Sequence, residues 1–585
     1  MKCLFGLAVF MTVALQTRTS PSTEVSIAEI ERTLHAIDVD RTAASDGERA
    51  SAEYLDRTLT EYGVAHVKYG ARLFLSWPGR ASVAIAGLPE MTAKTAAFAG
   101  STPTEGVNGP LVLDPKLTRR VDQTLEFEPG VRGKIPAVRG IEDTEALVLA
   151  GQRAGALAIV QIDATDTLHE DIVTTIWGTP TPEGAARSPV IPFVTIRKSD
   201  GDRLRAAVAK GPVTARVRSQ VTHGWRDEPI VVADVPGTSP DFVLVATHLD
   251  AWYHGMTDTG GSVASILEMA HVLQKHRNEL ARGVRFAWWT GHSFGRYAGS
   301  AWYADRFWAD LDRHCVGYTN LDGPGRRASR IDAVSAGGWP GLAEYARESA
   351  IRITGKTPAG GRGGPGRVFR PGRDSDSSFQ GLGIPFFSIG VPGPAAASGD
   401  IDAAGRVAYW HAPDDTFDKL DLHALELDTQ YRVAQLYELA TMPLLPHRIE
   451  PIAASYVAVL KDLSSTNATS FDLSSTLGLA TTLGAAASRF DRAPRPDATA
   501  FNTSVVRLTH LLNATLYTKA GRYEQDPAAA LPVLPLLARV RDLATLPRDG
   551  DEYGFLETEL TRGRNAVEDT LRRALDEIAN YEGHR

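Results

Sequence analysis

From residue 229 onward, the chain alternates short apolar runs with segments whose apolar residues recur at helical spacing. Residues 242–246, 284–289 and 316–321 form the apolar runs, which are typical of buried strands. Between the first two runs, one face of a helix is traced by Val263, Ile266, Leu267, Ala270 and Leu273. This alternation predicts an α/β fold built on a mainly parallel sheet that is flanked by helices.

The chain has 585 residues, which is too long for a single core. Residues 72–225 contain short β-like runs broken by Gly and Pro, and beyond residue 424 the pattern becomes helical. We therefore predict an α/β domain in two parts (21–95 and 226–445), a β-rich inserted domain (96–225) and a C-terminal helical domain (446–585).

The first residues have the pattern of an export signal. Lys2 precedes a short apolar run that ends near Leu15, and this run is too short for a stable membrane anchor. We predict a signal peptide over residues 1–20 and a secreted or periplasmic protein; the alternative is a mobile hydrophobic N-terminus. Cleavage would leave Cys315 as the only cysteine, so no intrachain disulfide is expected. The net charge of -8, without a long basic run, argues against a nucleic-acid binder.

Polar side chains gather at the ends of the predicted strands. His248 and Asp250 follow the first strand, Asp258 precedes the next helix, Asp322 follows a later strand, and His411 opens a loop. Each residue alone has an ordinary explanation; Asp258, for example, is well placed to cap a helix. Together they favour a divalent metal such as zinc, because binding sites form at the carboxyl ends of strands and zinc takes N and O ligands.

These motifs resemble those of the glutamate-carboxypeptidase-like zinc exopeptidases. The matching segments are Thr247-His248-Leu249-Asp250, Gly255-Met256-Thr257-Asp258, Asn320-Leu321-Asp322, the Ser-Asp loop Asp374-Ser375-Asp376-Ser377, and His411 through Thr416. Members similar to the transferrin receptor ectodomain carry an inserted protease-associated domain and a helical dimerisation domain. The resemblance implies these identities for residues 96–225 and 446–585, and it implies a homodimer.

The resemblance also implies roles for the site residues. His248 and Asp322 would bind one zinc ion, His411 would bind a second, and Asp258 would bridge the two. Asp250 and Asp415 would hold these ligands from behind. The expected activity is hydrolysis of an amide bond in a peptide-like substrate, by a metallo-aminopeptidase, carboxypeptidase or related amidohydrolase.

The chain departs from the family pattern at one position. The family has two adjacent glutamates, a general base and a zinc ligand, where this chain has His292 and Ser293. Ser293 is a poor zinc ligand, although it could contact metal or water, so the second zinc ion is in doubt. His292 could be the general base or a ligand of the second zinc ion. A third reading is a silent site in a non-catalytic binding or receptor-like protein.

An Arg-rich stretch lies just before the Ser-Asp loop. Arg373 could clamp a substrate carboxylate, and Asp376 belongs to the loop that borders the active site in the family. The alternative for the stretch is a solvated flexible loop, since Gly and Pro dominate there. We name Arg373 and Asp376 as candidate substrate-loop residues, with a peptide or an amino-acid derivative as the expected substrate.

Overall fold

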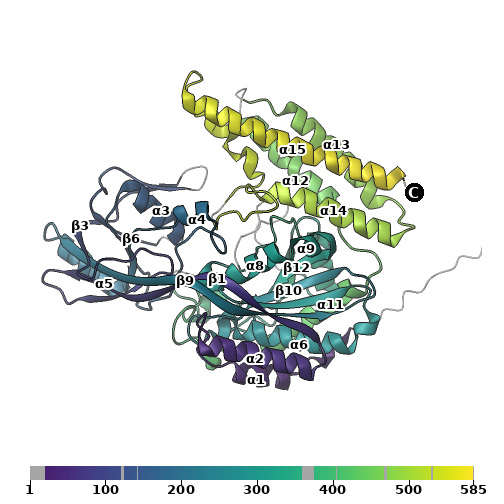
Figure 1. Ribbon diagram of the computed structural model, residues 1–585, viewed down its shortest axis with the longest axis horizontal. Coiled ribbons are helices and arrows are strands. Elements are labelled where there is room, and N and C mark those ends of the chain that lie inside the picture. The colour runs from purple at the N-terminus through teal and green to yellow at the C-terminus, as the bar shows by residue number, and fades with distance from the viewer. Residues whose placement is uncertain are drawn as a thin grey trace, which may run out of the picture.

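The computed structural model has three parts (Figure 1). It describes residues 20–119, 124–140, 143–358, 375–403, 405–466, 471–528 and 531–583. An α/β body occupies the centre, a lobe lies at one end of two long strands, and a helical bundle covers the body from above in this view. The predicted signal peptide lies outside the described residues, apart from Ser20. Within the described part of the chain, no helix has both the length and the apolar character needed to cross a membrane.

The body contains the predicted mixed sheet. Strand β10 (Phe242–His248) runs parallel to β11 (Gly283–Trp289) and to β12 (Cys315–Asn320), while β9 (Thr214–Val235) runs antiparallel to β11. Every residue of β10 is buried. Val243 and Val245 pack into the core on one face of the sheet, and Leu244 and Ala246 pack into the core on the other. A strand buried on both faces must be apolar at every position, which explains the continuous run in the sequence.

Helices cover both faces of this sheet. One face is covered by α1 (Ile27–Ala36), α2 (Asp46–Glu61), α6 (Gly261–Lys275) and α11 (Leu422–Thr441). The other carries α8 (Ala298–Arg306) and α9 (Trp308–His314). Shorter elements of the chain are β4 (Leu117–Arg119), β5 (Leu125–Phe127), α7 (His292–Gly295), β13 (Ser335–Gly338), α10 (Ala343–Thr354) and β14 (Phe387–Gly390). The predicted α/β class, with a mixed sheet flanked by helices, is confirmed.

The lobe grows out of the same sheet. Strand β1 (Ala65–Ile85) pairs with β9 from Ala65 opposite Asp234 to Ile85 opposite Ala215, so both strands run from the body into the lobe. The lobe has its own apolar clusters. Its principal elements are β2 (Met91–Thr95), β3 (Val107–Leu113), β6 (Ile135–Arg139), α3 (Thr144–Ala154), β7 (Ile159–Ile162), α4 (Pro182–Ala186), β8 (Phe193–Ile196) and α5 (Lys198–Val208).

The helical bundle shares its core with the body. Its long helices are α12 (Glu450–Thr466), α13 (Ser474–Arg492), α14 (Ala498–Tyr517) and α15 (Asp551–Gly583). Polar contacts reinforce the junction: Asn513 Nδ2 donates to the carbonyl of Gly383, and Gln525 Nε2 donates to the carbonyl of Ser378. The second contact fixes the loop that contains Asp376, so the bundle supports one wall of the site described next.

Candidate metal centre

Four predicted ligands meet at the carboxyl edge of the parallel strands. His248 ends β10, and Asp322 follows β12. Asp258 lies in a π-turn (Met256–Gly260) ahead of α6, and His411 lies in the loop before α11. Asp258 faces both imidazoles: its Oδ2 is 3.1 Å from His411 Nε2, and its Oδ1 is 3.7 Å from His248 Nε2. Segments that extend from residue 248 to residue 411 thus bring their polar groups to one place.

Carboxylates and imidazoles of the centre stabilise each other's charged forms. Burial lowers the pKa of His248, but the carboxylates of Asp258, Asp322 and Asp250 outweigh burial and raise it to about 10. Burial also acts to raise the pKa of Asp258, yet its contacts with His248 and His411 hold that pKa well below its usual range. Buried carboxylates of this kind require a cation beside them, and a divalent metal would meet the requirement.

The tautomers of both histidines suit metal binding. His248 Nδ1 donates to the carbonyl oxygen of Asp250 at 2.6 Å, and His411 Nδ1 donates to that of Glu170 at 3.0 Å. Each Nε2 therefore faces Asp258, and it offers a lone pair there when a metal ion takes the place of its proton. Among the described residues, His248 Nε2 is buried without a hydrogen-bond partner. A backbone carbonyl that fixes the other ring nitrogen is the usual support of a metal-binding histidine, so this donor set fits zinc.

Asp250 and Asp415 both accept hydrogen bonds from the backbone of the site. Asp250 accepts from the backbone N–H of His292 at 3.0 Å and of Ser293 at 3.3 Å. Asp415 accepts from the backbone N–H of Thr257 at 3.0 Å. Burial raises the pKa of Asp415 to about 6. Both carboxylates therefore fix backbone N–H groups at or next to site residues.

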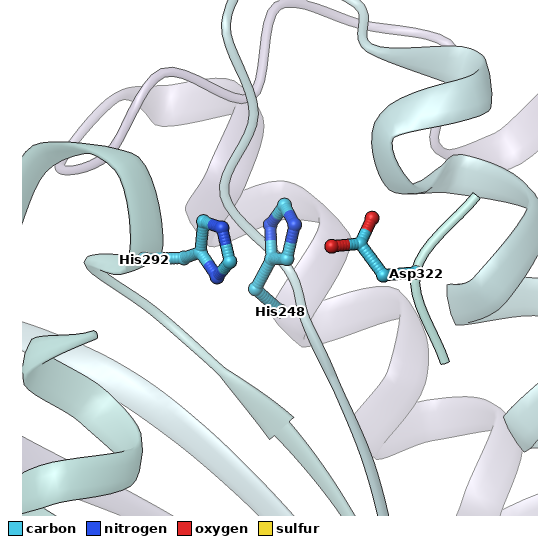
Figure 2. A group of neighbouring side chains, drawn as sticks. All are labelled: His248, His292 and Asp322. Carbon is cyan, nitrogen blue, oxygen red and sulfur yellow. The ribbon is translucent and has the colours of Figure 1, made fainter. Parts of the chain in front are cut away.

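His292 lies next to His248, on the side away from Asp322 (Figure 2). The ligating atoms of these three residues all lie within 4.8 Å of one another, which is compatible with a metal site. However, the His248 and His292 rings are stacked, with centroids 3.7 Å apart and planes only 18° apart. A nitrogen lone pair lies in its ring plane, so two stacked imidazoles cannot direct their lone pairs at one ion. The geometry favours His248 and Asp322 as ligands, with His292 beside them.

Asp376 is the partner of His292. Its Oδ2 lies 2.8 Å from His292 Nδ1, and its Oδ1 accepts from Ser300 Oγ at 2.7 Å. The Asp376 side chain is fully buried. The other candidate substrate-loop residue, Arg373, lies outside the described residues. Ser293 is 3% exposed, and within the described structure its Oγ is buried without a hydrogen-bond partner.

Several residues that support the site were missed in the sequence. Arg41 is fully buried and donates to the carbonyls of Leu249 and Gly255, which both lie in the segment between His248 and Asp258. Glu170 comes from the lobe and exchanges two hydrogen bonds with His411, one of them through its own backbone N–H. Both contacts join residues more than 200 positions apart, and no local pattern marks them.

A cavity of about 330 Å³ opens above the centre. Asp258, Asp322, His411 and His292 line its floor. The walls come from the lobe (Thr144, Glu145, Asp171 and Ile172) and from Arg296, Tyr297 and Trp410. This volume suits a small ligand or one end of a peptide.

Comparison with known proteins agrees with this geometry. Residues 230–433 match the model of peptidase family M28. The chain is 27% identical over 327 residues to "Probable lipoprotein aminopeptidase LpqL" of Mycobacterium tuberculosis, covering 54% of this chain and 61% of that protein. It is 27% identical over 161 residues to "Glutamate carboxypeptidase 2 homolog" of Caenorhabditis briggsae, covering 26% of this chain and 19% of that protein. The chain thus spans less than two thirds of the length of either relative.

A solved structure shows the same fold. "BSAP, a zinc aminopeptidase from Bacillus subtilis" superposes with a TM-score of 0.52 at 20% identity, covering 72% of this chain and 96% of that chain. The resemblance to glutamate-carboxypeptidase-like peptidases is confirmed as far as the match of residues 230–433 to peptidase family M28 extends. These similarities support a metallo-exopeptidase and do not favour the non-catalytic alternative.

Proposed function

Because residues 230–433 match peptidase family M28, we propose that this chain is a zinc-dependent aminopeptidase. The observation that carries the proposal is the centre itself, in which buried Asp258 faces His248 and His411 beside Asp322. Two similar proteins support the metal and the activity, since one is named a zinc aminopeptidase and another a probable aminopeptidase.

In this proposal, His248, Asp258, Asp322 and His411 hold zinc. Zinc supplies Lewis-acid polarisation of a carbonyl and lowers the pKa of water to near neutrality. The protein's own residues position the substrate, keep bulk water out and move protons. The cavity walls from the lobe would enclose the scissile bond above this floor.

We infer that His292 is the proton acceptor in place of the family's glutamate. Asp376 accepts the Nδ1–H of His292, so Nε2 is left unprotonated and able to take a proton. The buried carboxylate also stabilises the imidazolium that forms, as it would in other Asp–His pairs. The stacking of His292 on His248 places it beside the predicted zinc ligand without making it one.

Two variants separate this role from metal binding. Asp376→Asn should lower kcat by about 10- to 100-fold, because a lost carboxylate partner has effects of that order. His292→Gln should lower kcat further. Zinc content should stay unchanged in both variants. If His292→Gln loses zinc in proportion to activity, then His292 is a ligand and the base must be another group.

The hydrolytic proposal has a direct test. Zinc-loaded protein should release the N-terminal residue from unblocked peptides in a peptide library, followed by mass spectrometry. Asp258→Asn, which preserves shape, should abolish this release. Asp418→Asn, an exposed carboxylate close in sequence to His411, should not. Release of C-terminal residues instead would make the chain a carboxypeptidase, and no release from any peptide would refute the enzymatic proposal.

Three further features belong to the same proposal. We propose that residues 96–225 form a protease-associated domain, within a lobe that has its own apolar clusters. We also propose export directed by residues 1–20, and a homodimer formed through residues 446–585. N-terminal sequencing of the exported protein and light scattering on a gel-filtration column would test the last two.

A further inference from the structure

One acidic residue that the lobe brings to the cavity forms no ion pair with the described residues. Asp171 lines the cavity together with the predicted ligands. Among the described residues, no Lys, Arg or His nitrogen lies within ion-pair distance of Asp171. The other lobe carboxylate in the cavity, Glu145, is paired with Arg296. Of the lobe's two acidic groups there, Asp171 is the one without an ion pair in the described structure; the charges of His411 and Arg406 act on it from farther away, and the Thr144 side chain hydrogen-bonds to it.

Asp171 is held firmly in this position. Its carbonyl accepts from the backbone N–H of Ala97 at 2.9 Å, and one carboxylate oxygen accepts from the N–H of Ile172 at 2.7 Å. The preceding residue, Glu170, is bonded to His411 through both of its backbone polar groups. Asp171 therefore keeps a fixed position relative to the metal centre, as a recognition group must.

The charge balance of the cavity decides what Asp171 can recognise. The Glu145–Arg296 pair is neutral overall, so Asp171 is the carboxylate of the lobe wall that is not already paired with a cation. Burial raises the pKa of Asp171, and the nearby charges of His411 and Arg406 oppose that shift. A carboxylate in a partly closed cavity binds a cation with charge-assisted hydrogen bonds, and it repels another carboxylate. The described wall thus suits an ammonium group and disfavours a C-terminal carboxylate.

We propose that Asp171 binds the α-ammonium group of the substrate's N-terminal residue, and so makes the site select free N-termini. This inference rests on the proposed hydrolytic function, which it deepens by naming a specificity-determining residue. The N-terminal side chain would lie against the apolar and aromatic wall formed by Ile172, Tyr297 and Trp410. The lobe would then supply specificity, while the body supplies the metal ligands.

The test compares two substrates that differ only in the amine. Leucyl-p-nitroanilide carries it, and 4-methylpentanoyl-p-nitroanilide lacks it. Wild-type enzyme should prefer the first, and Asp171→Asn should reduce that preference by roughly 10- to 150-fold, the value of a charge-assisted hydrogen bond. Asp171→Glu should restore part of the preference. The matched control is Glu105→Gln, an exposed carboxylate of the same lobe.

Other results would overturn the inference. An equal loss on both substrates in Asp171→Asn would mean a structural role, and no preference in the wild type would mean no ammonium site. If neither substrate is hydrolysed, the hydrolytic proposal is in question. The ammonium site is then tested separately, by comparing the binding of L-leucinol with that of 4-methylpentanol by calorimetry. Tighter binding of leucinol that disappears in Asp171→Asn supports the ammonium site, and equal binding of the two alcohols refutes it.

Discussion

His447 should make the protein sensitive to acid at the junction between the body and the helical bundle. It lies between α11 and α12, is 1% exposed, and donates from Nε2 to the carbonyl of Val316 in β12 at 2.7 Å. Burial lowers its pKa to about 3; the bond to Val316 opposes this shift, and the nearby charges of His510 and Arg282 add to it.

The direction of the effect follows from the two pKa values. In the unfolded chain His447 would titrate near the usual 6.5, so on acidification the unfolded state binds this proton first. The stabilising contribution is therefore complete above pH 6.5 and is lost as the pH falls from 6.5 toward 3. At about 1.36 kcal/mol per pH unit, the loss between pH 6.5 and pH 5 is about 2 kcal/mol.

The substitution His447→Gln removes this pH-dependent contribution to the free energy of unfolding. Glutamine keeps a donor for the Val316 carbonyl and cannot be protonated in this range. Urea unfolding of metal-free protein, followed by tryptophan fluorescence, should show wild type losing about 2 kcal/mol more than the variant between pH 7 and pH 5. His35→Gln, at a side chain that is 61% exposed, is the control and should track wild type. Parallel curves for wild type and His447→Gln would refute the reasoning.

Three further predictions concern buried groups. Burial, reinforced by the charge of Asp250, raises the pKa of Glu48 well above its usual range, so Glu48→Gln should cost less than about 1 kcal/mol in urea unfolding. Glu48→Ala should cost about 1–3 kcal/mol, because Thr290 Oγ1 and the N–H of Ala44 lose their acceptor. Burial raises the pKa of the Cys315 thiol to about 12, so Ellman's reagent should label it only after unfolding; labelling of native protein would contradict this. Gly383→Ala should cost about 2–4 kcal/mol in thermal unfolding, since φ is +74° and a Cβ would lie 2.0 Å from the His510 carbonyl. Gly355→Ala, at φ +68° with nothing within 4 Å of its Cβ, should cost only about 1 kcal/mol and isolates the steric part.

Local sequence patterns were enough to predict the fold and to name the four candidate ligands. Apolar runs and helical spacing predicted the α/β sheet, and a parallel sheet brings strand ends together, so His248 and Asp322 could be expected to meet. The prediction that His292 and Ser293 stand where the family has two glutamates depends on neighbouring residues that fix the position of the motif.

The rest depended on long-range packing. Nothing near Asp376 in the sequence indicates that its carboxylate lies against His292, because the two residues are 84 positions apart and only folding brings them together. Asp171 and Glu170 sit in a segment without repeat or motif, and their place beside His411 follows from how the lobe folds back on the body. Arg41 likewise contacts backbone carbonyl groups, and because every residue has one, the sequence gives no sign of these contacts.

The most direct test of the central claim is the zinc content of wild type and Asp258→Asn, measured by elemental mass spectrometry after zinc loading and dialysis. Asp258 lies between His248 and His411, so its carboxylate should be indispensable for retention. Wild type should keep zinc and Asp258→Asn should lose it, while Asp418→Asn should behave as wild type. Equal zinc in wild type and Asp258→Asn, or none in wild type, would contradict a metal centre at these residues.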